Sequence, residues 1–174
     1  MPLLHLILQA GDNMILKRMK RRHSREQVLD FCKQTLSLRP NIAFGADIIA
    51  GFPTETDEMF NNTYELLNDI QKIVHLHVFP YSERSGTPAA KMPQVEKHIR
   101  KKRAASLRDL GKKLLNQHMH QQIGKNINIV VENNRLGRAE DFCMVNFINT
   151  NNTTIGTIQK HIVKSVNNGK LIVE

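Results

Sequence analysis

The chain has 174 residues, of which 40% are hydrophobic, and a formal net charge of +9. This length is typical of one domain, or of one modest domain with a small module, and the apolar content is sufficient for a core. No stretch approaches the roughly 18 consecutive apolar residues of a membrane-spanning helix, and the N-terminal residues lack the pattern of a signal peptide. Cys32 and Cys143 form no Cys-x-x-Cys pair and are expected to be buried, reduced thiols.

The chain opens with an apolar run followed by two helix signals. Leu4 to Leu8 predicts a short buried strand. Asp12 is positioned to cap a short helix that ends at Met19. Ser24, with Gln27 three residues later, forms a capping box at the start of a second helix.

The strand and helix patterns continue to alternate. Pro40 is expected to end the second helix, since proline disfavours helix in the residue before it. Ile42 to Ala50 predicts a strand covered on both faces, Thr56 to Ile70 a helix, and Ile73 to Phe79 a further strand. This alternation predicts an α/β fold with a parallel sheet and crossover helices. Three strands do not close a barrel, so residues 1–92 are interpreted as part of a larger β/α barrel.

A long basic helix is predicted from Pro93 to Gln122, and residues 93–122 are assigned as a connecting helix. Its apolar face is formed by Val95, Ile99, Leu107, Leu110 and Leu114, and basic residues project from the opposite side. A basic amphipathic helix can also lie on a membrane, but this helix has no Trp, Phe or Tyr. No membrane partner is therefore expected.

Positive charge is concentrated in two clusters. The first contains Lys17, Arg18, Lys20, Arg21, Arg22 and Arg25, and the second Lys97, Arg100, Lys101, Lys102, Arg103, Arg108, Lys112 and Lys113. Contacts between such clusters and phosphates release counterions and add affinity. A solvated basic surface is the alternative, but two clusters on one small chain favour an RNA partner.

The remaining residues, 123–174, have a different character. They contain four short runs rich in β-branched residues, separated by turn residues: Asn126–Glu132, Arg138–Ile148, Gly156–Val166 and Lys170–Val173. This pattern predicts a small antiparallel β-barrel.

Four segments carry the resemblance to a known family. They are Leu4-His5-Leu6, Gln9-Ala10-Gly11-Asp12, the run from Asp47 to Thr56 that contains Gly51-Phe52-Pro53-Thr54-Glu55, and the run from His77 to Pro88. In order and spacing the chain resembles the radical-SAM tRNA methylthiotransferases, and most of all those that thiomethylate N6-threonylcarbamoyladenosine beside the anticodon. The related isopentenyladenosine enzymes share much of this pattern. The resemblance implies the C-terminal half of an open, TIM-like radical-SAM barrel followed by a tRNA-binding TRAM-like module.

The resemblance also implies a cofactor site for S-adenosylmethionine. The residues expected to bind it are Gln9, Asp47, Ile49, Gly51, Glu55, Phe79 and Pro80. Ile49 is expected to pack on the adenine, and the backbone at Phe79 and Pro80 to contact it. From the residues alone, the Gly51 loop is more typical of a strand-to-helix turn without a ligand. Asp47 is equally typical of a salt-bridge partner for the basic clusters. Thr54, Ala10 and Ile7 depart from the family pattern, which has Gly and two Ser residues there.

RNA contacts are expected from a second set: Arg21, Tyr81, Ser82, Arg84, Lys97, Lys101, Arg108 and Lys112. Arg84 suits phosphate because the guanidinium presents a planar fork of donors. His5, His75 and His77 lie in predicted strands and show no spacing typical of a metal site, so each is expected to be an ordinary hydrogen-bonded histidine.

The cysteines that hold the iron–sulfur clusters of such enzymes are absent from this chain, which predicts no catalytic and no metal-ligating residues. The resemblance therefore implies a piece of a cytoplasmic transferase that is inactive alone. Three alternatives stay open: a non-catalytic tRNA-binding module, the partner of a separately encoded N-terminal half, and a decayed gene product.

Overall fold

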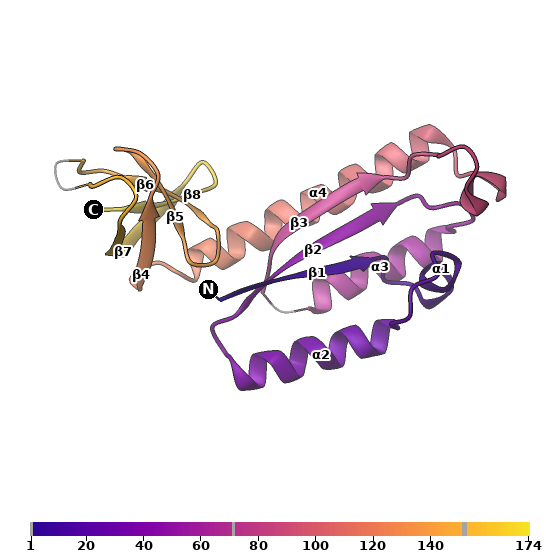
Figure 1. Cartoon of the computed structure of the whole chain (residues 1–174), viewed down its shortest axis with the longest axis horizontal. Helices are drawn as coiled ribbons and strands as arrows, with labels where there is room; N and C mark the ends of the chain where they lie inside the picture. The colour runs from indigo at the N-terminus through magenta and orange to yellow at the C-terminus, as the bar shows by residue number, and fades with distance from the viewer. Residues whose placement is uncertain (1, 71, 151–152) are drawn as a thin grey trace. The chain divides into compact units, whose positions relative to one another are not determined.

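The computed structural model describes residues 2–70, 72–150 and 153–174. These residues form two compact units (Figure 1). One unit, here called the α/β unit, contains Leu4–Lys112, and the other, the barrel unit, is made chiefly of Lys113–Glu174. In the described parts of the chain, no helix combines the length and apolar character needed to cross a membrane.

The α/β unit is built on a three-stranded sheet in the order β1-β2-β3. The three strand arrows point the same way in Figure 1, and β2 and β3 pair in parallel with Asp47 opposite His77. In chain order the elements are β1 (Leu3–Gln9), α1 (Asn13–Arg18), α2 (Arg25–Leu38), β2 (Ala43–Ala50), α3 (Asp57–Asp69), β3 (Ile73–Pro80), the 3-10 helix η1 (Pro88–Lys91) and α4 (Lys97–His120). The predicted α/β pattern with a parallel pair and crossover helices is confirmed.

Local side-chain chemistry sets the helix starts as predicted. Asp12 accepts hydrogen bonds from the backbone N–H groups of Met14 and Ile15, at 2.9 and 3.0 Å, and so caps α1. Ser24 and Gln27 form both hydrogen bonds of a capping box at α2. Helix α2 ends at Leu38, and Arg39, the residue before Pro40, is its C-terminal cap.

Burial along β2 corrects one expectation. Residues 43–46 are buried on both faces, but Asp47 and Ile49 are only half-buried while Ile48 and Ala50 between them are fully buried. The second half of β2 is therefore covered on one face, and the other face, near the carboxyl ends of the strands, is open to solvent. This open face carries the side chains described below.

Helix α4 differs from its prediction in two respects. It begins at Lys97 rather than at Pro93 and ends at His120. Arg100 and Arg103, which were assigned to the exposed basic cluster, are only 8% and 7% exposed. Helical spacing explains the error, because the two side chains lie on the same side of the helix as the buried Ala104 and Leu107.

The barrel unit is a closed five-stranded barrel in the order β4-β5-β6-β8-β7. Its strands are β4 (Asn126–Val131), β5 (Leu136–Ala139), β6 (Met144–Phe147), β7 (Ile158–Asn167) and β8 (Lys170–Val173). The predicted strand over Arg138–Ile148 is wrong as a single element, since a turn with Phe142 at φ 66° separates β5 from β6. The barrel is also not wholly antiparallel, because β6 and β8 pair in parallel. Part of the predicted turn at Asn149–Asn152 lies outside the described residues.

Candidate functional site

A pocket of about 310 Å³ lies beyond the carboxyl ends of β1 and β2 in the α/β unit. Its lining residues are Gln9, Arg18, Met19, Lys20, Arg21, Ile49, Phe52, Thr87, Pro88 and Ala89. In open α/β sheets this edge is where ligands bind, since the loops after neighbouring parallel strands converge there. Three predicted site residues, Gln9, Ile49 and Arg21, are brought together in it. We call this space the strand-end pocket.

The pocket combines an apolar floor with basic side chains. Ile49 is half-buried on β2, and Phe52 belongs to a small core cluster with Ala10, Ile15 and Leu16. Arg18 donates from Nη1 to the carbonyl oxygen of Thr54 at 3.4 Å, while Arg21 is exposed. An apolar surface with cations at its rim suits a ligand that has a flat apolar part and an anionic part.

The Gly51 loop is held by contacts within the chain. Gly51 adopts φ 72°, and a Cβ there would lie 2.7 Å from Cγ and 3.0 Å from Cα of Arg100. Its backbone N–H donates to Oε2 of Glu55 at 2.9 Å. The missing side chain of Gly51 therefore makes room for Arg100 of α4.

Glu55 is buried and engaged inside the protein. Its Oε2 accepts from Nη1 of Arg103 at 2.9 Å, and only 2% of its side chain is exposed. Burial raises the pKa of Glu55, and this desolvation outweighs the opposing effects of Arg103 and the Gly51 N–H. Nη2 of Arg103 also contacts the fully exposed carboxylate of Asp57 at 2.6 Å. Glu55 is not among the residues that line the strand-end pocket.

The segment after β3 divides into a packed and an exposed part. Phe79 and Pro80 pair with Ile49 and Ala50 at the end of the sheet, and both are exposed. The Tyr81 ring packs edge-on against Phe52, with centroids 5.3 Å apart. The guanidinium of Arg100 lies 5.2 Å from the centroid of the same ring. The buried Tyr81 hydroxyl has no hydrogen-bond partner among the described residues.

Most of the predicted RNA-binding residues in α4 and in the segment after β3 are exposed to solvent and accessible to a large ligand. Ser82, Arg84, Lys97, Lys101, Arg108 and Lys112 are exposed. Two of them already have partners: Arg108 donates to the carbonyl oxygen of Val78 at 2.9 Å, and Lys112 pairs with Asp109 at 3.0 Å. The exposed basic surface is thus smaller than the sequence suggested, since Arg100 and Arg103 are not part of it.

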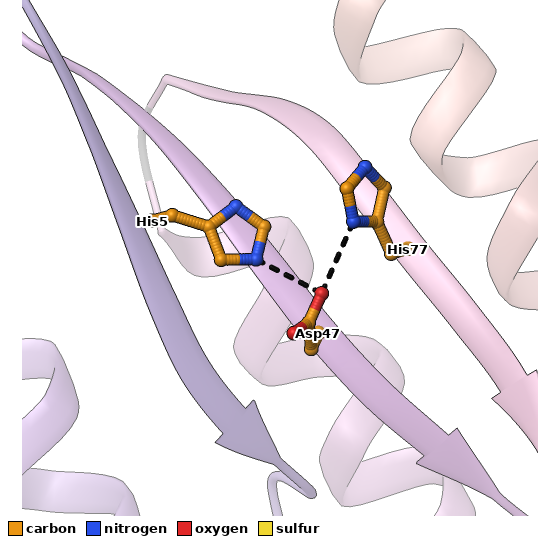
Figure 2. Close-up of side chains that lie close together, drawn as sticks. All are labelled: His5, Asp47 and His77. Carbon is orange, nitrogen blue, oxygen red and sulfur yellow. Dashed lines mark hydrogen bonds and ion pairs between the residues drawn. The ribbon is translucent and has the colours of Figure 1, made fainter.

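Asp47 is not among the residues that line the strand-end pocket, and its carboxylate lies between two histidines. Figure 2 shows His5 of β1 and His77 of β3 pointing toward Asp47 on the central strand β2. Nε2 of His5 lies 2.9 Å and Nδ1 of His77 lies 3.1 Å from the same Oδ1 of Asp47. We call these three residues the His-Asp-His cluster. His5 and His77 are thus hydrogen-bonded as expected, but to the same carboxylate oxygen, which the sequence did not indicate.

Two groups of residues were therefore missed at the sequence level. For the cluster, the available signal was the presence of polar residues inside three apolar strands expected to lie side by side: His5 in the first, Asp47 in the second, and His75 and His77 in the third. For the strand-end pocket, the missed residues are Arg18, Met19, Lys20, Phe52, Thr87, Pro88 and Ala89. Phe52 follows β2, and the other six lie in or beside α1 and η1, the first helices after β1 and β3. The loops and helix ends beyond the carboxyl ends of parallel strands are where such sites are lined.

Comparisons with known proteins agree with the motif assignment. The model of the radical SAM superfamily matches residues 1–67. A threonylcarbamoyladenosine tRNA methylthiotransferase MtaB of Rickettsia prowazekii is 53% identical over 145 residues, which cover 83% of this chain and 34% of that protein. A probable threonylcarbamoyladenosine tRNA methylthiotransferase of Methanocaldococcus jannaschii is 40% identical over 83% of this chain and 34% of that protein.

A third relative carries a different substrate in its name. It is a tRNA-2-methylthio-N(6)-dimethylallyladenosine synthase of Pelotomaculum thermopropionicum, 40% identical over 74% of this chain and 29% of that protein. The chain thus spans about a third of the length of the curated relatives it matches. By these similarities and by its motifs, the chain belongs to the radical-SAM tRNA methylthiotransferase family.

Proposed function

We propose that this chain is the C-terminal part of an S-adenosylmethionine-dependent tRNA methylthiotransferase that acts on N6-threonylcarbamoyladenosine. In this proposal residues 1–92 supply the second half of a radical-SAM barrel, residues 93–122 a basic connecting helix, and residues 123–174 a TRAM-like barrel that helps to hold tRNA. The preference for threonylcarbamoyladenosine follows the relative of greatest identity among those described above.

The observation that carries the proposal is the strand-end pocket. It brings Gln9 and Ile49, from two of the recognised motifs, to one edge of the sheet, with Arg18 and Arg21 beside them. Its volume of about 310 Å³ is at the lower end of the range for small-molecule sites. S-adenosylmethionine offers an adenine for the apolar floor and a carboxylate for an arginine. Such enzymes hold iron–sulfur clusters, which generate the radical from this cofactor in the whole protein.

The chain by itself is proposed to be inactive. Cys32 and Cys143 are its only cysteines, and both are buried. Burial raises the pKa of the Cys32 thiol to about 11, which disfavours the thiolate that iron requires. The test is incubation of the purified, anaerobically reconstituted chain with tRNA, S-adenosylmethionine and reductant. Formation of methylthiolated nucleoside in that reaction would overturn this part of the proposal.

Cofactor binding can be tested separately from catalysis. S-adenosylhomocysteine is expected to bind the whole chain, and Ile49→Asp is expected to weaken binding by about tenfold or more, because it places a carboxylate on the apolar floor. Isothermal titration calorimetry measures both. The matched control is Ile158→Asp, a change at an exposed isoleucine of β7 in the barrel unit. Equal binding by the two variants contradicts the assignment of this pocket.

A tRNA-binding module without chemistry is the second candidate. It is favoured by the exposed basic side chains of α4 and by the closed barrel. An N-terminal half encoded separately is compatible with either candidate, and a decayed product predicts a chain that binds neither cofactor nor tRNA.

The α4 contribution to RNA binding makes a salt-dependent prediction. The double change Lys97→Ala/Lys101→Ala is expected to reduce the slope of log affinity against log salt by about 1.4–1.8, since each phosphate contact contributes about 0.7–0.9. Filter binding of tRNA at several salt concentrations gives this slope. Lys33→Ala/Arg39→Ala, which removes two exposed charges from α2 and its end, should leave the slope unchanged. Absence of tRNA binding at low salt would remove the RNA-binding proposal.

A further inference from the structure

We propose that the His-Asp-His cluster is a binding site for a divalent transition-metal ion of the zinc or ferrous class. This site is distinct from the strand-end pocket and from iron–sulfur chemistry, because it uses no cysteine. It does not depend on the proposed function, since all three ligands belong to the sheet of the chain itself.

The spacing of the ligand atoms fits one small ion. One potential ligand atom from each of His5, Asp47 and His77 lies within 4.8 Å of the other two. The two nitrogen-to-oxygen distances are 2.9 and 3.1 Å. Ligands about 2.0–2.2 Å from a tetrahedral zinc ion are about 3.4 Å apart, so only small side-chain shifts are needed to admit the ion.

The arrangement of the rings supports convergence on a point. The His5 and His77 rings have centroids 5.2 Å apart and are tilted by 37°, so they do not stack (Figure 2). Both imidazoles direct a nitrogen at a single carboxylate oxygen, which leaves that oxygen shared between two donors. A cation at this point would bond to all three atoms at once, and the carboxylate would offset part of its charge.

The sheet positions these ligands before any ion binds. They occupy three neighbouring strands, and Asp47 and His77 are direct partners in the parallel register. Gly45 makes room for the third ligand, since a Cβ at that residue would lie 2.5 Å from Nδ1 of His5. Ligands fixed by strand pairing lose little conformational freedom on binding, which favours affinity.

The cluster also leaves coordination positions open. The side chains of His5, Asp47 and His77 are 38%, 27% and 57% exposed, so water or a ligand can reach the ion from the open face of the sheet. Two histidines and one carboxylate with an open position are typical of catalytic zinc and non-haem ferrous sites. Fully closed structural zinc sites have four protein ligands instead.

Cobalt(II) is a suitable probe, because its visible absorption reports the ligand geometry. The whole chain, titrated with Co²⁺ at neutral pH, is expected to bind one equivalent with a visible d–d band. Hyperfine-shifted imidazole N–H signals in the proton NMR spectrum of the wild-type chain should come from two histidines. Zn²⁺ should displace the cobalt and abolish the band.

Variants assign the site. His77→Gln and Asp47→Asn are each expected to weaken Co²⁺ binding by about 100-fold, since even outer-shell partners of metal ligands are worth about 10–100-fold. Gly45→Ala keeps all three ligands but displaces the His5 ring, and should weaken binding too. His98→Gln is the control, because His98 is 75% exposed and pairs only with Glu96 in the described structure.

Two results would overturn the proposal. One is the absence of a one-equivalent cobalt complex, or of shifted histidine signals, in folded wild-type chain. The other is undiminished binding by His77→Gln and Asp47→Asn, with far-UV circular dichroism showing that both variants are folded. Since neither readout involves S-adenosylmethionine or tRNA, failure here is distinguishable from failure of the proposed function.

Discussion

Replacing Arg103 with Met is expected to lower the free energy of unfolding of the α/β unit by about 3–5 kcal/mol, the cost of leaving one partner of a buried ion pair alone. Arg103 is 7% exposed, and its Nη1 donates to both the carbonyl oxygen and Oε2 of Glu55 at 2.9 Å. The contact with Asp57 contributes little, since that carboxylate is 99% exposed. Most of the loss therefore comes from Glu55.

The measurement is urea unfolding followed by tyrosine fluorescence. The chain has two tyrosines, Tyr64 and Tyr81, and both lie in the α/β unit, so this signal reports on that unit alone. Lys102→Met is the control, because Lys102 directly precedes Arg103 in α4 and its side chain is exposed. A loss below about 1 kcal/mol for Arg103→Met would show that the ion pair does not hold the Gly51 loop.

The same variant has a defined pH dependence. The folded pKa of Glu55 is raised above 4.5, so the stability that the neutral carboxyl provides is present below 4.5 and is lost as the pH rises through the folded pKa. Arg103 opposes this loss by stabilising the carboxylate. The difference between Arg103→Met and wild type should therefore be larger at pH 7 than at pH 4.5, and an equal difference at both values would contradict this account.

Asp141→Asn is expected to destabilise the barrel unit by about 3 kcal/mol, because the buried imidazole of His118 loses its carboxylate hydrogen-bond partner. Oδ2 of Asp141 lies 2.6 Å from Nε2 of His118, and the two side chains are 13% and 9% exposed. Oδ1 accepts from the backbone N–H of Cys143 at 3.1 Å. Among the described residues, Nδ1 of His118 is buried without a partner, so the imidazole is held through Nε2, by Asp141 and by a longer 3.4 Å contact with Nε2 of Gln122.

Hydrogen exchange of the barrel amides measures this effect. Protection of the strand residues Val145 and Leu171, which pair across β6 and β8, should fall in Asp141→Asn. Asp109→Asn is the control, since Asp109 is an exposed carboxylate of α4. Unchanged protection in Asp141→Asn would show that the pair is dispensable for the barrel.

The pH dependence has the opposite sign from that of Glu55. Burial alone would raise the pKa of Asp141, but hydrogen bonds from His118 and the Cys143 N–H outweigh it, so the pKa is lowered from 3.8. The stability that the carboxylate provides is therefore present above 3.8 and lost as the pH falls through the folded pKa. The difference in unfolding free energy between wild type and Asp141→Asn should become smaller below pH 3.8. A difference in unfolding free energy that stays constant below pH 3.8 would contradict this role of the Asp141 carboxylate.

Local interactions were readable from the sequence because they act within a few residues. The Asp12 cap and the Ser24 capping box need only a side chain and the N–H groups two or three positions later. The end of α2 before Pro40 and the alternation of strands and helices are likewise set by short-range sterics and periodicity. The motifs also identified the family, since the residues of a motif and the order of the motifs can be read without knowing the fold.

Burial of charge was decided by packing. Arg100 and Arg103 carry the same charge as their exposed neighbours Lys101 and Lys102, and helical spacing is the only sign in the sequence that they lie on the buried side. Their burial depends on Glu55, nearly fifty positions earlier, and on the gap left by Gly51. Likewise, the turn that divides β5 from β6, with Phe142 at a positive φ, lies inside the segment that the sequence pattern predicts as one strand.

The sequence by itself determined the family, the α/β character, the β-rich end of the chain and most of the helix and strand boundaries, because each rests on local pattern. The tertiary structure alone decided which polar residues meet. His5, Asp47 and His77 are separated by 42 and 30 positions, and only the pairing of three neighbouring strands brings their nitrogen and oxygen atoms within about 3 Å. Strand register is a long-range property, since it depends on which strands pair and at which residue.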